Sequence, residues 1–366
     1  MLMKAPVLHS PREPLAVEDV EIDDPRAGEV RVKMTASGVC HSCLYAWDGS
    51  AQNVRTPMVL GDEGAGVVEA VGPGVESVGP GDRVIISWAP NCGRCHFCVI
   101  GRPVLCDVRG RQPSRLRLPP SGLGTDGREV ANFGGVATYG SYTVIPESGA
   151  VRIPDAMPLD TAALIGCSVM TGVGSVLNTA RVEAGESLAV FGCGGVGLNA
   201  VQGGRIAGAY PLIAVDVADN KLEYAQAMGA THTINAARED AVEAIQQLTS
   251  RGADYAVVAV GDTRVQAQAY RAISRGGTLV VVGMAQSGEL TIDSKAPLVM
   301  QERCIKGSCY GSARPREDFL RLVNLYLTGR LKIDELITRR YTIGQATEAF
   351  EDLEQGRLAR GLIVFD

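Results

Sequence analysis

The strongest constraint on the fold is a glycine-rich run at residues 192–197, GCGGVG, which follows the pattern G-x-G-x-x-G. An apolar stretch at 186–192 leads into the run, and a helical pattern follows it. In that context the glycines allow a tight turn, a close approach of backbone to a pyrophosphate, and contact between helix and strand. The helix N-terminus adds amide hydrogens and partial positive charge. We therefore predict a dinucleotide site at Gly192, Gly194, Gly195, Val196 and Gly197.

The next apolar stretch predicts which dinucleotide binds. Asp216 ends the stretch at 211–216, at about the 20-residue distance that the fingerprint requires. A carboxylate there accepts the ribose hydroxyls of NAD and repels the 2′-phosphate of NADP. Lys221 lies within reach of the same ribose. We expect NAD(H) as the cofactor; the alternative is a glycine-rich turn that binds no ligand.

The order of apolar stretches and helical patterns along the chain indicates an α/β protein with two domains. Apolar stretches from 186 to 283 alternate with helical patterns such as 219–229 and 237–252, which is typical of a doubly wound parallel Rossmann sheet. Residues 1–150 alternate short apolar runs with glycine, proline and aspartate, and the mixed character returns after 300. We predict a Rossmann domain over 164–299 and a β-rich domain built from 1–163 and 300–366. Residues 107–135 lack a clean period and are expected to form a surface excursion.

Four cysteines predict a structural metal site. Cys92, Cys95, Cys98 and Cys106 follow the pattern C-x2-C-x2-C-x7-C. Four thiolates close a tetrahedral zinc shell and leave no open position, so such a site is structural. An iron–sulfur cluster is disfavoured because the Cys-Pro that ends the bacterial ferredoxin run is absent. Cysteines that are buried without a metal are the remaining alternative.

Composition limits the partners. The net charge of -6 argues against nucleic acid and anionic membranes. No apolar run approaches the roughly 18 residues that a membrane span needs, and the first ten residues do not resemble a secretory signal. In a cytoplasmic chain, the clustering among its ten cysteines favours metal binding over disulfides. We expect a cytoplasmic protein that acts on a small molecule.

Several motifs resemble the zinc-dependent medium-chain alcohol dehydrogenases over nearly the whole chain. They are GVCHS (38–42), LGDEGAGVVEAVG (60–72), GDRVI (81–85), the cysteine lobe, GCSVMTG (166–172), FGCGGVG (191–197) and GRLARGLIVFD (356–366). The excursion at 107–135 is most similar to the glutathione- or mycothiol-linked formaldehyde dehydrogenase branch. The resemblance implies that the β-rich domain is GroES-like and that the chain forms a homodimer. The apolar segment at 304–311 supports the dimer, because it can extend the sheet at its edge.

The resemblance also implies a role for each of these positions. The catalytic zinc would be held by Cys40, the residue at 62 and Cys167, with Glu63 directly behind. Ser42 would contact the substrate oxygen and begin a proton relay. The other implied roles are NAD pyrophosphate contacts for His41 and Arg360, and pocket lining near the nicotinamide for Trp88 and Thr171.

The reaction centre departs from the family at three positions. Where relatives usually carry a histidine, an aspartate that supports it and a relay histidine, this chain has Asp62, Cys43 and Tyr45. The changes fit together, because an aspartate at 43 has no role without the histidine and would repel Asp62. Two thiolates, a carboxylate and Zn²⁺ sum to minus one rather than zero, which weakens the Lewis acid. Three states remain open: zinc with an exchangeable position, zinc closed off by Cys43, and no zinc.

These features lead to three hypotheses of function. The first is NAD-dependent hydride transfer between an alcohol and an aldehyde at the modified zinc site. The second is reduction of an activated C=N or C=C bond with weak or no catalytic zinc, in which Tyr45 or Ser42 donates the proton. The third is a catalytically silent, NAD-binding redox protein that uses its thiols.

Overall fold

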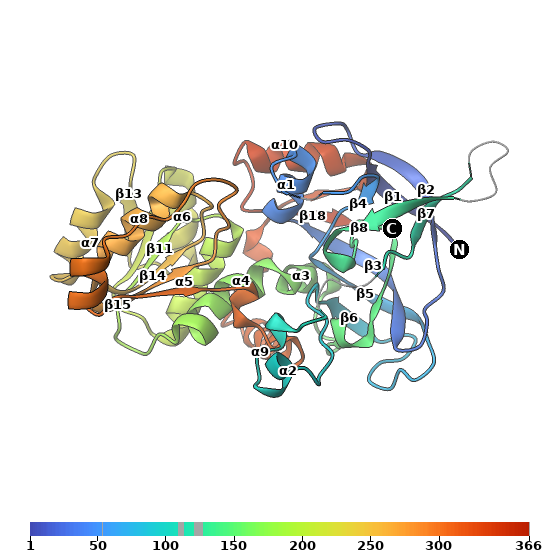
Figure 1. Cartoon of the computed structure of the whole chain (residues 1–366), viewed down its shortest axis with the longest axis horizontal. Helices are drawn as coiled ribbons and strands as arrows, with labels where there is room; N and C mark the ends of the chain where they lie inside the picture. Colours follow the sequence, from blue (N-terminus) through green and yellow to red (C-terminus); the bar gives the residue numbers. More distant parts are fainter. Residues whose placement is uncertain (53, 109–112, 121–126, 366) are drawn as a thin grey trace. The chain divides into compact units, whose positions relative to one another are not determined.

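The computed structural model describes residues 1–52, 54–108, 113–120 and 127–365. The chain forms two compact units, which Figure 1 shows coloured along the sequence. The first unit comprises Met1–Cys167 with Arg314–Asp366, and the second comprises Ser168–Ala313. The domain boundaries expected from the sequence, 1–163 with 300–366 and 164–299, stay a prediction.

The first unit contains a small barrel. In the described part of the chain, the closed barrel has the strand order β1 (Leu2–Leu8), β2 (Ala16–Ile22), β7 (Leu116–Leu118), β8 (Arg128–Asn132) and β4 (Met58–Val59). Both β7 and β8 lie within the segment that we expected to be an irregular excursion. These strands are only three and five residues long, too short for an alternation that stands out in the sequence, and their pairing with β2, with β4 and with each other orders them.

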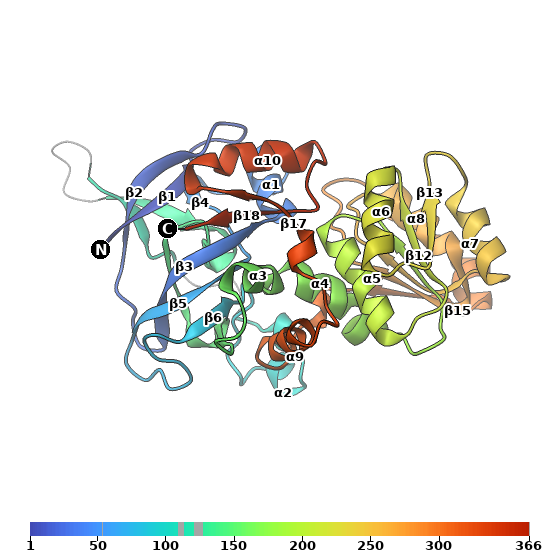
Figure 2. The ribbon, with the colours of Figure 1, turned by 180° about the vertical axis from the view of Figure 1, so that it is seen from behind.

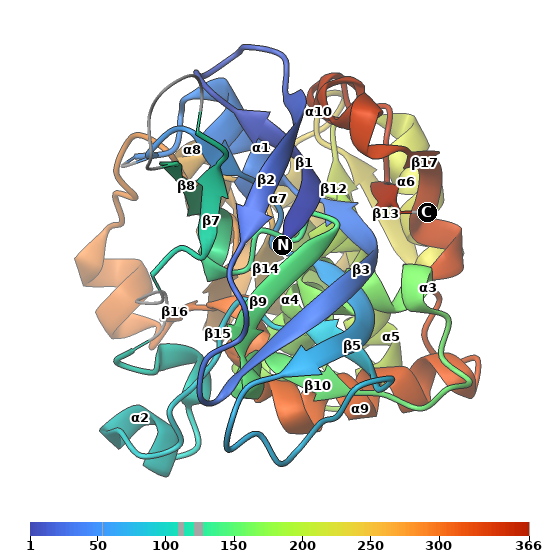
Figure 3. The same ribbon diagram turned by 90° about the vertical axis from the view of Figure 1, so that its right-hand side faces the viewer.

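A second sheet in the same unit carries the candidate site. Its order is β10 (Ala150–Arg152), β6 (Arg83–Ile86), β5 (Gly64–Val71), β3 (Glu29–Val39), β18 (Arg360–Val364) and β17 (Ile337–Tyr341), and β9 (Tyr142–Pro146) also pairs with β3. Figure 3 shows β9, β3 and β5 side by side. The helices of this unit are α1 (His41–Asp48), α2 (His96–Val99), α3 (Leu159–Ala163), α9 (Pro315–Leu327) and α10 (Ala346–Glu354). A buried aromatic group of Trp47, Tyr139 and Phe350 ties α1 to α10.

The second unit is a doubly wound parallel sheet, which confirms the predicted fold class. Among the described residues its strand order is β13 (His232–Asn235), β12 (Leu212–Asp216), β11 (Leu188–Phe191), β14 (Ala253–Val258), β15 (Ile273–Val281) and β16 (Cys304–Gly307). Its helices are α4 (Ser168–Gly174), α5 (Gly195–Ala207), α6 (Asp219–Met228), α7 (Ala241–Thr249) and α8 (Thr263–Ala272). Helices α5 and α6 cover one face and α7 and α8 the other, as Figures 1 and 2 show from opposite sides. The central strands are buried almost throughout, as parallel strands with two covered faces must be.

The helix expected at 237–252 is shorter in the structure than the sequence pattern predicts. The pattern at 237–252 predicts a helix of that length, whereas α7 spans Ala241–Thr249. Asp240 sets the start, because its carboxylate accepts hydrogen bonds from the amides of the first turn. Ser250, in the left-handed conformation, ends the helix.

No single helix in the described ranges is long and apolar enough to cross a membrane. One bent pair, Leu159–Gly166 with Ser168–Ala180, meets the test by length and composition alone.

Candidate active site and structural zinc lobe

Sheet pairing brings the first two candidate ligands together. Cys40 directly follows β3, and Asp62 lies two residues before β5. These strands run antiparallel with Ser37 opposite Gly64, so the end of one meets the beginning of the other. The turn into β5 needs glycine at 61, where φ is +103° and a Cβ would lie 2.5 Å from the hydroxyl oxygen of Thr138.

Close backbone packing adds the third ligand. Cys167 follows the short turn Leu164–Gly166. A Cβ at Gly166 would lie 2.8 Å from the carbonyl oxygen of Ile86 and 3.3 Å from the amide nitrogen of Gly64. The glycine therefore allows the close approach to β6 and to the start of β5 that brings Cys167 to the other two ligands.

The three groups converge on one buried point. The Sγ atoms of Cys40 and Cys167 and a carboxylate oxygen of Asp62 lie within 4.8 Å of one another. Their residues are 7%, 8% and 6% exposed. Zinc bonds of about 2.0–2.3 Å place tetrahedral ligand atoms roughly 3.5–3.8 Å apart, so small side-chain adjustments would close this set around the ion. Two thiolates and one carboxylate oxygen are donors that suit zinc and leave a fourth position open.

The Asp62 carboxylate is contacted at both oxygens. The Ser42 hydroxyl donates to Oδ2, and the Cys43 thiol donates to Oδ1 at 3.7 Å between sulfur and oxygen. Burial, reinforced by the negative charge of Cys40, raises the pKa of Asp62 to about 7. The donors from Ser42 and Cys43 oppose that shift, as does the positive charge of Arg360.

The thiols of the site differ in their acidity. The hydrogen bond with Cys167 holds the pKa of Cys40 well below its usual range, and the Arg360 charge adds to that effect. The same hydrogen bond, with burial, raises the pKa of Cys167. Burial and the charge of Asp62 raise the pKa of Cys43, which therefore keeps its proton. Before any metal binds, Cys40 is the favoured thiolate of the group.

Glu63 and Arg360 form a buried ion pair in the first unit. Their side chains are 0% and 3% exposed, and an Arg360 nitrogen contacts the Glu63 carboxylate. Gly38 makes room for this carboxylate, because a Cβ there would overlap it. The structure thus pairs Arg360 with Glu63, and the roles expected for them, behind the zinc ligands for Glu63 and at the NAD pyrophosphate for Arg360, stay predictions.

Two other predicted residues lie on α1 of the same unit, and a third lies on the second unit. His41 is exposed, and its ring centroid lies 6.2 Å from that of Tyr45 in an edge-on contact. Tyr45 is half-buried, and burial together with the charge of Asp48 raises its pKa. Thr171 lies in α4 of the second unit.

Sequence reasoning missed one segment of the site. A Cβ built on Gly134 would lie 3.6 Å from the Cβ of Asp62 and 3.7 Å from the Cβ of Trp88. The turn Phe133–Gly135 therefore lies beside the candidate ligand, although it belongs to the excursion at 107–135. The pair of glycines at 134 and 135, both at positive φ, is the only local signal of that turn.

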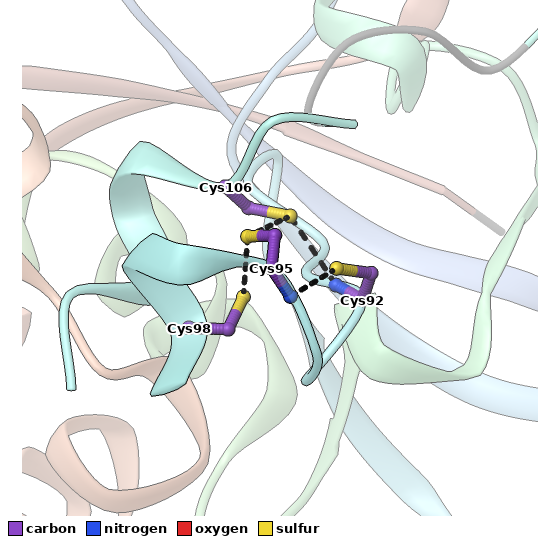
Figure 4. A group of neighbouring side chains, drawn as sticks. All are labelled: Cys92, Cys95, Cys98 and Cys106. Carbon is purple, nitrogen blue, oxygen red and sulfur yellow. Dashed lines mark hydrogen bonds between the residues drawn. The ribbon is translucent and has the colours of Figure 1, made fainter. Parts of the chain in front are cut away.

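The four cysteines of the lobe lie together, as Figure 4 shows. The Sγ atom of Cys95 lies 3.5 Å from that of Cys98 and 3.8 Å from that of Cys106. A tetrahedron with Zn–S bonds of about 2.3 Å has edges of roughly 3.8 Å, so the arrangement fits zinc. Backbone amides of Arg94 and Cys95 lower the pKa of Cys92 to about 6, which favours the thiolate that a metal needs.

The glycine-rich turn has the shape that a dinucleotide requires. Gly192 has φ +89°, and a Cβ at Gly197 would collide with the carbonyl of Gly192. A Cβ at Gly194 would meet no atom within 4 Å, so the space in front of the turn is open to a ligand. The Asp216 carboxylate accepts from the amide of Cys193 at 2.7 Å and so lies at the turn. Lys221 is close enough to affect the pKa of Cys193.

Comparison with known proteins agrees with this picture. Residues 26–155 match the alcohol dehydrogenase GroES-like domain, and residues 195–328 match the zinc-binding dehydrogenase domain. The chain is 41% identical to the NDMA-dependent alcohol dehydrogenase of Amycolatopsis methanolica, over 100% of this chain and 99% of that protein. It is 37% identical to the S-(hydroxymethyl)glutathione dehydrogenase of Saccharomyces cerevisiae, over 99% of this chain and 96% of that protein. Among solved structures, an alcohol dehydrogenase zinc-binding domain protein from Burkholderia ambifaria has a TM-score of 0.94 at 33% identity. The match covers 100% of this chain and 99% of that protein.

The chain belongs to the zinc-dependent medium-chain alcohol dehydrogenase family, and it is an oxidoreductase. The resemblance seen in the sequence and the predicted fold, a Rossmann sheet with a GroES-like unit, are confirmed.

Proposed function

We propose that this enzyme transfers hydride between NAD(H) and an alcohol or aldehyde, with zinc held by Cys40, Asp62 and Cys167. The observation that carries the proposal is the convergence of these three buried groups within 4.8 Å of one another. The Ser42 hydroxyl adjoins them. Zinc bound there would polarise the oxygen of the substrate, and the nicotinamide would give or take the hydride.

Ser42 is oriented to accept a hydrogen bond from the substrate. Its hydroxyl donates to Asp62, so the lone pairs of its oxygen remain available to accept from the hydroxyl of an alcohol substrate. Asp62 therefore serves twice, as a ligand and as the group that orients Ser42. On the second unit, the open space at Gly194 and the carboxylate of Asp216 support NAD(H) as the cofactor.

Metal content together with turnover tests this proposal. The parent chain should bind two zinc ions and oxidise members of a series that contains primary alcohols and S-(hydroxymethyl)glutathione. NAD is the acceptor, and NDMA is a second acceptor because one relative depends on it. Cys167→Ser should reduce the content to one zinc and lower the rate at least about 100-fold, which corresponds to roughly 2.7 kcal/mol of transition-state stabilisation.

Thr328→Ala is the control, since this exposed hydroxyl at the end of α9 donates to carbonyls of its own helix and belongs to neither cluster. It should keep both zinc ions and the parent rate. A parent chain that contains one zinc and reduces an activated C=N or C=C substrate would favour the second hypothesis. A parent chain with no turnover on any substrate would favour the third.

We also propose that two copies associate through β16, one of the two edge strands of the described parallel sheet. The cytoplasmic location expected from the sequence stays a prediction, as does the structural role of the zinc at the lobe.

A further inference from the structure

Cys43 lies beside the candidate ligands without being one of them. It is fully buried near the start of α1, and its Sγ lies 3.7 Å from Oδ1 of Asp62. The groups that converge as ligands belong to Cys40, Asp62 and Cys167. The contact of Cys43 is therefore with the carboxylate ligand.

The opposite oxygen of the carboxylate has a donor of its own. The Ser42 hydroxyl contacts Oδ2, so Asp62 receives one donor on each oxygen, both from the first turn of α1. A carboxylate that rotates freely can offer a metal one oxygen or two. Donors on both oxygens hold its plane in one orientation and leave a lone pair of one oxygen for the ion.

The thiol is itself held in place. The backbone of Gly61 hydrogen-bonds Cys43, and the hydroxyl of Tyr139 contacts the same thiol. Tyr139 is 0% exposed, and its hydroxyl donates to the carbonyl of Gly38 at 3.3 Å. Cys43 is thus fixed by the turn that carries Asp62 and by the packed ring behind it.

We propose that Cys43 is a positioning residue that orients the Asp62 carboxylate for zinc. It does for an aspartate ligand what a carboxylate partner does for a histidine ligand in other metal sites. An aspartate at 43 would set a second negative charge against Asp62, whereas a thiol supplies a donor without charge. This inference deepens the proposed function and rests on it.

The test measures metal binding in the full-length chain, with its lobe kept loaded. Zinc affinity of the second site is measured by competition with a chelator. The same site is then loaded with Co²⁺, whose thiolate charge-transfer bands count sulfur ligands and whose d–d bands report geometry. The variants are Cys43→Ala, which removes the donor, and Cys43→Ser, which keeps one. Thr328→Ala, at the end of α9, is the control.

We expect Cys43→Ala to weaken zinc binding about 10- to 100-fold and to shift the d–d bands, with charge-transfer intensity unchanged. Cys43→Ser should restore most of the affinity, and Thr328→Ala should match the parent. One full zinc at the lobe, with parent-like circular dichroism, shows that a variant has folded.

Unchanged affinity and spectrum in Cys43→Ala would overturn the inference alone. Loss of the intensity of one thiolate would also overturn it, because Cys43 would then be a ligand. A parent chain that binds only the lobe zinc would overturn the proposed function and, with it, this inference.

Discussion

Removing the buried partner of Arg360 should destabilise the first unit strongly. Glu63→Gln keeps the shape of the side chain but leaves a guanidinium that is 3% exposed without its carboxylate. Breaking a buried ion pair in this way costs about 3–5 kcal/mol, because the remaining charge stays out of water. For a unit of this size each kcal/mol lowers the melting temperature by about 2–4 °C, so we expect a fall of roughly 6–20 °C.

Differential scanning calorimetry at saturating zinc measures the effect, and three further variants, Glu354→Gln, Arg360→Met and a double variant, interpret it. Glu354→Gln is the matched control, because its pair with Arg12 spans 2.8 Å but is 42% and 53% exposed. A surface pair contributes about 0–1 kcal/mol, so this variant should lose at most roughly 4 °C. Glu63→Gln combined with Arg360→Met removes both charges and should lose less than the sum of the two single variants. A fall under about 2 °C for Glu63→Gln, or strict additivity, would refute the reasoning.

Three further predictions concern cofactor, lobe and ligand. In fluorescence titrations the parent should bind NADH more tightly than NADPH. Asp216→Ala should lower the ratio of the NADPH dissociation constant to the NADH dissociation constant by about tenfold. Equal binding of the two cofactors by the parent would defeat the assignment. Cys95→Ser should lose the lobe zinc and much of the soluble, folded protein, since binding and folding are coupled there; a stable variant with unchanged zinc content would count against a structural site. Asp62→His with Cys43→Asp should oxidise primary alcohols faster than the parent and than either single variant, because the imidazole restores a neutral site and the carboxylate orients it. A parent that oxidises primary alcohols as fast as the double variant would show that aspartate in place of the family's histidine has no chemical consequence.

Local signals made two parts of the molecule predictable from sequence. The turn at Gly192–Gly197 rests on glycines whose conformations are needed within six residues, and the structure shows the tight packing of Gly197 against Gly192. The lobe is likewise local, with Cys95 and Cys98 separated by two residues and their sulfurs by 3.5 Å. Motifs with such close spacing predict the local geometry, because few backbone conformations place their residues as the ligand requires.

The rest of the site depends on distant parts of the chain. Cys40, Asp62 and Cys167 meet only because β3 pairs with β5 and Gly166 packs against a neighbouring strand. Without the family resemblance, nothing in their spacing indicates one site. The contact of Cys43 with Asp62 had a sequence counterpart, since both positions depart from the family together, but the hydrogen bond itself needed the structure.

The turn at Phe133–Gly135 was not predictable for a different reason. It follows β8, whose place is set by pairing with β4 and β7 rather than by an apolar alternation of its own. Sequence reading treats such a segment as irregular, although tertiary pairing brings Gly134 next to Asp62.

The most direct test of the central claim is a crystal structure with NAD bound and an anomalous map recorded at the zinc edge. We predict two zinc peaks per chain, one among the four lobe cysteines and one bonded to Cys40, Asp62 and Cys167. The Sγ atom of Cys43 should contact the Asp62 carboxylate and lie well beyond the Zn–S bond length of about 2.3 Å. A single peak at the lobe, or a second zinc bonded to Cys43, would contradict the account.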